Sequence, residues 1–133
     1  MAIIALVDDD SIFQFTATRL LESSKLAQNI LHFENGAEAL TFLREKALQK
    51  ELLPDYLFLD INMPFVDGWM FLEDFTTLKS SLAKDISIYM VSSSIDPRDL
   101  NRAKSFSEVT DFIIKPISLE RFQELLKSTQ TIE

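Results

Sequence analysis

Residues 3–24 read I-I-A-L-V-D-D-D-S-I-F-Q-F-T-A-T-R-L-L-E-S-S, and this stretch decides the fold. The apolar run Ile3–Val7 has the length of a strand and lacks alternating polar residues, as expected of a strand buried on both faces. Three aspartates follow it. From Ser11 to Ser24 apolar side chains recur at helical spacing, and Ser11 with Gln14 three residues later predicts a capping box. The stretch therefore predicts a strand followed by a helix.

The alternation of strand and helix continues along the chain. Further strands are predicted at Ile30–Phe33, Tyr56–Leu59, Ile86–Val91 and Phe112–Ile114, and helices at Ala37–Lys50, Trp69–Leu78, Asp96–Ser105 and from the cap Ser118 onward. Leu48 belongs to the apolar stripe predicted for the second helix. Five mostly apolar strands that alternate with five helices indicate an α/β fold with a parallel sheet covered on both faces. This (βα)5 unit consumes residues 1–133, so we expect one domain and no output domain.

Composition excludes several classes of protein. The chain has 133 residues, 47% of them hydrophobic, a net charge of −8 and no cysteine. This is enough apolar material for a globular core, and the acidic balance with scattered lysines and arginines argues against nucleic-acid binding. No apolar run approaches the roughly 20 residues that span a bilayer, and no basic region precedes the first apolar run, so we expect no membrane segment and no secretory signal. Absent cysteine fits a cytoplasmic location.

Polar residues follow the predicted strands at one edge of the sheet. Asp8 and Asp9 follow the first strand, Asp60 the third, Ser92 the fourth and Lys115 the fifth. Because the carboxyl ends of parallel strands share one rim, where ligands bind in open sheets, we expect these side chains to lie close together.

The charge of this group predicts a metal ion. Three neighbouring aspartates repel one another, and with Lys115 they sum to −3 + 1 = −2. Mg²⁺ takes oxygen ligands and brings that sum to zero. Such a site accepts a phosphoryl group well, since metal, ammonium and a serine hydroxyl hold the developing negative charge.

Four strings at these strand ends resemble a known family. L-V-D-D-D at 6–10, F-L-D-I-N-M-P-F-V-D-G at 58–68, V-S-S-S at 91–94 and I-I-K-P-I at 113–117 resemble the receiver domain of two-component response regulators, in its order and spacing over the whole chain. The resemblance implies a flavodoxin-like strand order 2-1-3-4-5. It also implies a cis bond before Pro116 and a loop in which Gly68 allows the backbone to turn.

The resemblance assigns roles to individual residues. Asp60 is then the phosphoacceptor, Asp9 a direct Mg²⁺ ligand, and Asp8 the acidic partner that holds metal-bound water. The backbone carbonyl of Asn62 is offered to the metal, and Ser92 and Lys115 bind the phosphoryl group. Phe112 occupies the aromatic switch position: its ring turns inward when Ser92 moves to the phosphoryl group, which reshapes the face made by the fourth helix, fifth strand and fifth helix.

The first helix suggests a partner surface. If Phe13 and Ala17 face the core, a step of about 100° per residue places Phe15 nearly opposite and Ile12 at the flank. Receivers of this family dock kinases or phosphotransfer proteins against their first helix, so Ile12 and Phe15 are candidate partner contacts. His32 is expected at the surface or the sheet edge, without a phosphotransfer role.

We therefore expect a single-domain response regulator that takes a phosphoryl group from a histidine kinase or histidine phosphotransfer protein onto Asp60. It then signals by phosphorylation-dependent protein binding or relays the phosphate, as a monomer or a phosphorylation-dependent dimer. It phosphorylates and slowly dephosphorylates itself and is not a classical turnover enzyme.

Three alternatives use the same residues differently. A haloacid-dehalogenase-like phosphatase would use Asp8 and Asp10 as a D-x-D pair, but Ile12 stands where that family expects Thr or Val, and the chain has no room for a cap. A flavodoxin-like FMN protein needs a hydroxyl-rich phosphate loop after the first strand, where three aspartates would repel phosphate. A receiver that is never phosphorylated and acts only as a binding module is the third alternative.

Overall fold

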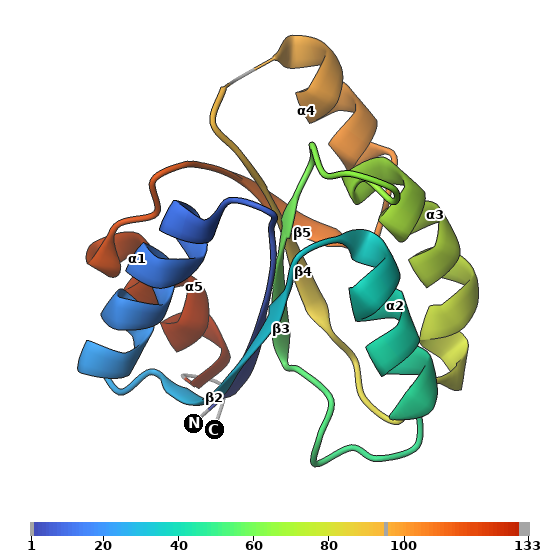
Figure 1. The fold of residues 1–133 in the computed structure, drawn as a ribbon, viewed down its shortest axis with the longest axis horizontal. Helices are drawn as coiled ribbons and strands as arrows, with labels where there is room; N and C mark the ends of the chain where they lie inside the picture. The colour runs from blue at the N-terminus through green and yellow to red at the C-terminus, as the bar shows by residue number, and fades with distance from the viewer. Residues whose placement is uncertain (1, 95, 131–133) are drawn as a thin grey trace.

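The computed structural model describes residues 2–94 and 96–130. Its centre is a five-stranded sheet in the order β2-β1-β3-β4-β5, and every neighbouring pair of strands is parallel. The strands are β1 (Ala2–Val7), β2 (Ala27–Phe33), β3 (Tyr56–Asp60), β4 (Ser87–Ser92) and β5 (Val109–Ile114). Their carboxyl ends therefore meet along one edge of the sheet, at the top of Figure 1.

Helices cover both faces of the sheet, so the predicted α/β class and strand order are confirmed (Figure 1). On one face lie α1 (Ser11–Ser23) and α5 (Leu119–Gln130), and on the other α2 (Gly36–Glu45), α3 (Gly68–Leu78) and α4 (Pro97–Lys104). A short 3-10 turn, η1 (Lys79–Ser81), follows α3. No helix in the described part of the chain combines the length and apolar character needed to cross a bilayer.

The sheet separates two hydrophobic cores, because successive side chains of a strand point to opposite faces. In β1, Ile4 and Leu6 join the core under α1 and α5, while Ala5 and Val7 join the core under α2 and α3. All four side chains are fully buried. Burial on both faces explains why the central strands read as continuous apolar runs.

Both edge strands begin three residues earlier than predicted. β2 starts at Ala27 rather than Ile30, and β5 starts at Val109 rather than Phe112. Gln28 and Asn29 are exposed polar residues at the start of β2. This part of the edge strand therefore has no apolar run from which a strand could be predicted. Ala2 pairs with Ala27 in the ladder.

Helix α2 ends at Glu45, five residues before the predicted Lys50. Leu48, predicted on its buried stripe, is 85% exposed. The chain leaves the helix because the carbonyl of Ala47 accepts a hydrogen bond from Ala83 N at 2.8 Å, in the segment before β4. That contact is distant in sequence, so the local pattern did not reveal it.

The predicted capping box at the start of α1 is wrong. The N-cap is Asp10, whose Oδ1 accepts hydrogen bonds from Ile12 N at 3.0 Å and Phe13 N at 3.2 Å. The Gln14 side chain points back toward the strand ends instead of bonding at Ser11. By contrast, the predicted caps Asp96 of α4 and Ser118 of α5 accept bonds from Arg98 N and Arg121 N.

The turn after β3 does not use Gly68 as predicted, since neither glycine has a positive φ. The left-handed residue is Phe65, with φ 67° and a side chain 85% exposed. Gly68 is needed for space, because a Cβ at this position would lie 2.6 Å from the Asp60 carbonyl oxygen. Its lack of a side chain lets α3 start against the end of β3.

Candidate functional site

Three aspartates meet at the carboxyl edge of the sheet. Asp8 and Asp9 directly follow β1, and Asp60 is the last residue of β3, the strand hydrogen-bonded beside β1. Each offers a carboxylate oxygen, and these oxygens lie within 4.8 Å of one another. Asp8 and Asp60 are 1% and 7% exposed, whereas Asp9 is open to solvent. The cluster is therefore buried on one side and accessible on the other.

Lys115 supplies the opposing charge from the end of β5. Its Nζ lies 2.8 Å from Asp8 Oδ2 and 3.8 Å from Asp60 Oδ1. The ammonium also lies 4.8 Å from the centre of the Phe13 ring, a cation–π contact. The Lys115 backbone N donates to Ser92 O at 2.8 Å, and the following peptide bond to Pro116 is cis, as expected. The lysine is therefore anchored at both its backbone and its side chain.

The pKa of the Asp60 carboxyl is raised from 3.8 to about 7. Burial is the largest cause, and the neighbouring charge of Asp8 is the next; Lys115 lowers the pKa and Asp9 raises it further. A carboxyl with this pKa is only partly ionised at neutral pH when no cation is bound. A cation bound beside Asp60 would therefore favour its ionised form.

The residues present fit a hard divalent cation. The donor set consists of carboxylate oxygens, which Mg²⁺ and similar ions prefer. Asp8 Oδ2 is buried and accepts no hydrogen bond of acceptable geometry, although Lys115 lies beside it. One ammonium facing three carboxylates leaves a charge of −2, which a divalent ion balances. The acidic cluster therefore has the donors and the charge that a hard divalent cation requires.

Of the other predicted site residues, Ser92 ends β4 and Asn62 lies in the loop after β3, whereas Phe112 lies inside β5, two residues before its end. Ser92 is the last residue of β4 and is 4% exposed; its Oγ accepts from Ser94 N at 3.3 Å. Asn62 is exposed, two residues beyond Asp60. Phe112 in β5 is half-buried and packs against the core on the side of α2 and α3. A buried hydroxyl therefore ends the strand paired with β3, and an aromatic ring lies between core and surface in β5.

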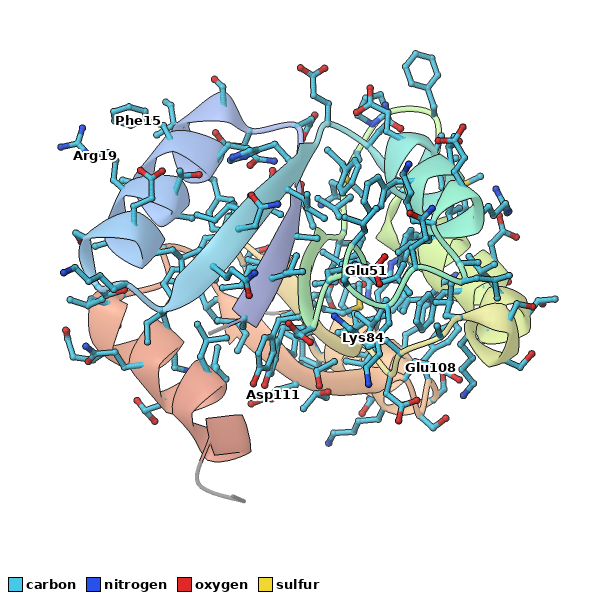
Figure 2. All side chains as sticks on the ribbon, turned by 90° about the horizontal axis from the view of Figure 1, so that it is seen from below. Phe15, Arg19, Glu51, Lys84, Glu108 and Asp111 are labelled. Carbon is cyan, nitrogen blue, oxygen red and sulfur yellow. The ribbon has the colours of Figure 1, made fainter. Side chains whose placement is uncertain are left out.

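Ile12 and Phe15 are exposed on α1, as the helical spacing predicted. Their exposed fractions are 76% and 63%, and the Arg19 guanidinium lies 5.5 Å from the centre of the Phe15 ring. Figure 2 shows Phe15 and Arg19 projecting from the outer side of the helix. His32 is exposed on β2, as expected.

Asp10 does not pair with Asp8 as the phosphatase alternative requires. Its Oδ1 caps α1, and its Oδ2 is 3.8 Å from Lys115 Nζ. Asp8 Oδ1 in turn accepts a bond from Asp10 N at 2.8 Å. Asp10 therefore orders the loop instead of adding a fourth carboxylate to the cluster.

Sequence reasoning missed one residue of the site, Gln14. Its side chain contacts the loop that carries the acidic cluster, whereas the sequence pattern assigned it to a capping box. One signal could have found it. Gln14 lies four residues, about one helical turn, after Asp10, so it shares the face of α1 on which the acidic loop lies.

Comparisons with known proteins agree with this architecture. The family model described as the response regulator receiver domain matches residues 4–127. The chain is 29% identical over 131 residues to the probable methanogenesis regulatory protein FilR2 of Methanothrix harundinacea, covering 98% of this chain and 81% of that protein. Two other curated relatives are much longer, and the chain spans only 34% and 15% of their lengths.

Solved structures show the same fold. A two-component response regulator from Cytophaga hutchinsonii superposes with a TM-score of 0.86 at 26% identity, covering 98% of this chain and 97% of that one. A response regulator receiver protein from Dyadobacter fermentans gives a TM-score of 0.81 at 28% identity, with 95% of each chain covered.

Proposed function

Since the chain belongs to the response regulator receiver domain family, we propose that it accepts a phosphoryl group on Asp60 with a divalent cation, Mg²⁺, held by the acidic cluster. The observation that carries the proposal is the meeting of three carboxylates and one ammonium at the ends of β1, β3 and β5. An aspartate in such a setting is a competent phosphoryl acceptor.

The transfer step follows from the chemistry of Asp60. An ionised Oδ attacks the phosphorus of a phosphohistidine on the donor protein, the P–N bond breaks, and the imidazole nitrogen leaves with the electron pair and takes up a proton. The product is an acyl phosphate on Asp60. Because the raised pKa of about 7 leaves part of the Asp60 carboxyl protonated at neutral pH, that part must lose its proton before it can attack.

A divalent cation bound by Asp8, Asp9, Asp60 and the Asn62 carbonyl would ionise Asp60 and offset the charge of the incoming phosphoryl group. Lys115, held near both Asp8 and Asp60, adds a second positive charge on that group. Ser92 contributes a hydroxyl. The chain then acts as a phosphoacceptor that signals, and it is not a turnover enzyme.

The output is proposed to be a population shift at the face of α4, β5 and α5. When the Ser92 hydroxyl turns to the phosphoryl group, the half-buried Phe112 ring gains room to move inward. The changed face then binds a target protein, or the phosphoryl group is relayed onward. A net charge of −8 favours protein partners over nucleic acid.

The donor is proposed to be a histidine kinase or histidine phosphotransfer protein that docks on α1. The exposed Ile12 and Phe15 provide apolar contacts on the helix that begins directly after the acidic loop. Phe15→Glu should slow transfer from such a protein and leave phosphorylation by a small-molecule donor unchanged. An unaltered rate from the protein donor would remove Phe15 from the docking surface.

Intact mass spectrometry tests the central proposal. After incubation with acetyl phosphate and Mg²⁺, the wild type should gain about 80 Da, one phosphoryl group, and the gain should disappear with chelator. Asp60→Asn should show no gain. Asp85→Asn, an exposed aspartate before β4, is the matched control and should gain the same mass as wild type.

Two results would count against phosphoacceptance at Asp60. An adduct that persists in Asp60→Asn would move the acceptor to another residue. No adduct in any variant, with a donor shown to phosphorylate another receiver, would favour the alternative in which this receiver acts by protein binding alone.

A further inference from the structure

The Gln14 side chain ties together three backbone carbonyls at the edge of the acidic site. Its Nε2 lies 3.0 Å from Leu6 O and 3.1 Å from Asp8 O, at the end of β1. It also lies 3.2 Å from Phe33 O, at the end of β2. The Phe33 carbonyl accepts from Asp8 N at 3.0 Å as well. One amide thus joins α1, the edge strand β2 and the loop that starts the acidic cluster.

The orientation of this amide is fixed by chemistry. Carbonyl oxygens only accept hydrogen bonds, so the amino group of Gln14 must face them, and Oε1 must face away. Oε1 lies 2.7 Å from His32 Nδ1 on β2. Because an amide oxygen has no hydrogen to give, Nδ1 of His32 must carry the proton. Neutral His32 is therefore held as the Nδ1–H tautomer, with Nε2 left as the acceptor.

Hydrogen bonds therefore hold Asp8 through its backbone N and O and through Oδ1, and only Oδ2 accepts none. Its N and O are tied to Phe33 and Gln14, its Oδ1 accepts from Asp10 N, and its Oδ2 faces Lys115. Gln14 and His32 also line a cavity of about 220 Å³ that contains Asp8 and Asp9. Together with Phe15 and Arg19 they line a second cavity, of about 330 Å³. The pair is therefore shared by a cavity at the acidic loop and a cavity at the exposed side of α1.

We propose that Gln14 is a positioning residue: its amide, hydrogen-bonded to His32, holds the Asp8–Asp9 segment in the arrangement that binds the divalent cation. This inference rests on the proposed function, because it concerns the same metal site. Gln14 does not touch the metal ligands' carboxylates; it acts through the Asp8 backbone. Removing such supporting hydrogen bonds around a metal site lowers metal affinity by about 10- to 100-fold.

The test uses the metal-free protein first. His32 is the only histidine of the chain, so ¹⁵N NMR observes its tautomer without ambiguity. At pH 8 we expect the Nδ1–H tautomer in wild type. In Gln14→Met, which keeps the length of the side chain without its hydrogen bonds, we expect the Nε2–H tautomer that free imidazole side chains prefer. The Nε2–H tautomer in wild type would overturn the inference.

Mg²⁺ binding by calorimetry supplies the second readout. Gln14→Met should bind Mg²⁺ at least about tenfold more weakly than wild type. Gln28→Met, the same change at an exposed position of β2, is the matched control and should bind like wild type. Circular dichroism verifies that each variant is folded; if Gln14→Met is not, His32→Phe, which removes only the partner of Oε1, should still weaken Mg²⁺ binding.

The outcomes separate this inference from the proposed function. Wild-type affinity in folded Gln14→Met, or in His32→Phe where that variant replaces it, would overturn the role of Gln14 while leaving Asp60 phosphorylation intact. Failure of the wild type itself to bind Mg²⁺ would overturn both.

Discussion

Within residues 2–94 and 96–130, two residues other than glycine hold left-handed backbone conformations: Lys25 with φ 58° and Phe65 with φ 67°. Lys25 follows the C-cap Ser24 of α1, and Leu26 N donates to Leu21 O at 3.3 Å, the bond of a Schellman motif. Glycine adopts this conformation without the strain that a Cβ causes.

Lys25→Gly should therefore raise the free energy of unfolding by about 1 kcal/mol, because the strain at the end of α1 is relieved. Urea denaturation monitored by circular dichroism measures the change. Lys46→Gly is the matched control: Lys46 caps α2 with φ −105°, where glycine gains nothing. Equal effects of the two substitutions would show that left-handed strain is not the cause.

Gly68→Ala tests the close approach between α3 and the end of β3. The new Cβ would lie 2.6 Å from Asp60 O and 3.0 Å from Ile61 Cα, so the backbone at Asp60 must move. We expect a loss of about 2 kcal/mol in the free energy of unfolding and weaker Mg²⁺ binding, measured by denaturation and calorimetry.

Gly36→Ala is the control for that pair of measurements, because its Cβ would meet Val66 rather than the end of β3. It should lower stability while Mg²⁺ affinity stays at the wild-type value. If both variants lose affinity equally, general destabilisation explains the effect and the contact at Asp60 does not.

At the residue scale, sequence reasoning located the charged residues of the site but not their supports. Asp8, Asp9, Asp60 and Lys115 follow strands, so their meeting could be predicted from strand topology alone. The contacts of Gln14 could not, since they depend on the side-chain path past Leu6 and Phe33. The need for glycine at position 68 arises from the close approach of α3 to the end of β3, and no local sequence pattern reveals that approach.

Among the elements, α4 is held by few contacts. Only Ala103 is buried among its eight residues, whereas α3 buries five. It also contacts Trp69 of α3, since the Arg102 guanidinium lies 4.6 Å from the Trp69 ring centre. Phe106, just after α4, stacks on the same ring with centres 6.3 Å apart. A helix attached this sparsely can shift at low cost in free energy.

Trp69 is the only tryptophan of the chain, so its fluorescence reports on α4. Adding beryllofluoride, a phosphoryl mimic, with Mg²⁺ should change the Trp69 emission, because a shift of α4 alters the contact with Arg102. Asp60→Asn should show no change. Unaltered emission of wild type under conditions where the adduct forms would exclude α4 from the switch.

Element boundaries could be predicted where burial sets them, and could not be predicted where contacts between distant parts of the chain set them. Central β3 lies within one residue of its predicted bounds, because burial on both faces makes it apolar throughout. Edge strands β2 and β5 and the end of α2 were misplaced. Their limits are set by pairing with β1 and β4 and by the Ala47–Ala83 hydrogen bond, which join distant parts of the chain.

For the whole molecule, the parallel sheet gathers charged residues from distant parts of the sequence at one edge. Each strand places its following residue at the same edge, so three carboxylates and a lysine distant in sequence come together. The fold bears the cost of bringing like charges together. Burial first, and then the charge of Asp8, raises the pKa of Asp60 to about 7, so this cost changes with protonation.

Stability should therefore depend on pH and Mg²⁺ together. The folded protein holds the Asp60 proton up to about pH 7, and the unfolded chain only up to about pH 4. The native state binds the extra proton between these values, so its contribution is full below about pH 4 and is lost as pH rises through about 7. The free energy of unfolding should fall across this window, by at most about 4 kcal/mol.

Comparing wild type with Asp60→Asn isolates this contribution, since the amide does not titrate. Without Mg²⁺, urea denaturation should find Asp60→Asn more stable than wild type at pH 8 and the difference reduced or reversed at pH 5. Mg²⁺ should stabilise wild type at pH 8, by about 2.7 kcal/mol at a hundred times its Kd, and less at pH 5, where the proton competes for the carboxylate. A difference between the two proteins that stays constant from pH 5 to 8 would mean that Asp60 is already ionised in the metal-free fold, and Lys115 rather than the cation would then balance the site.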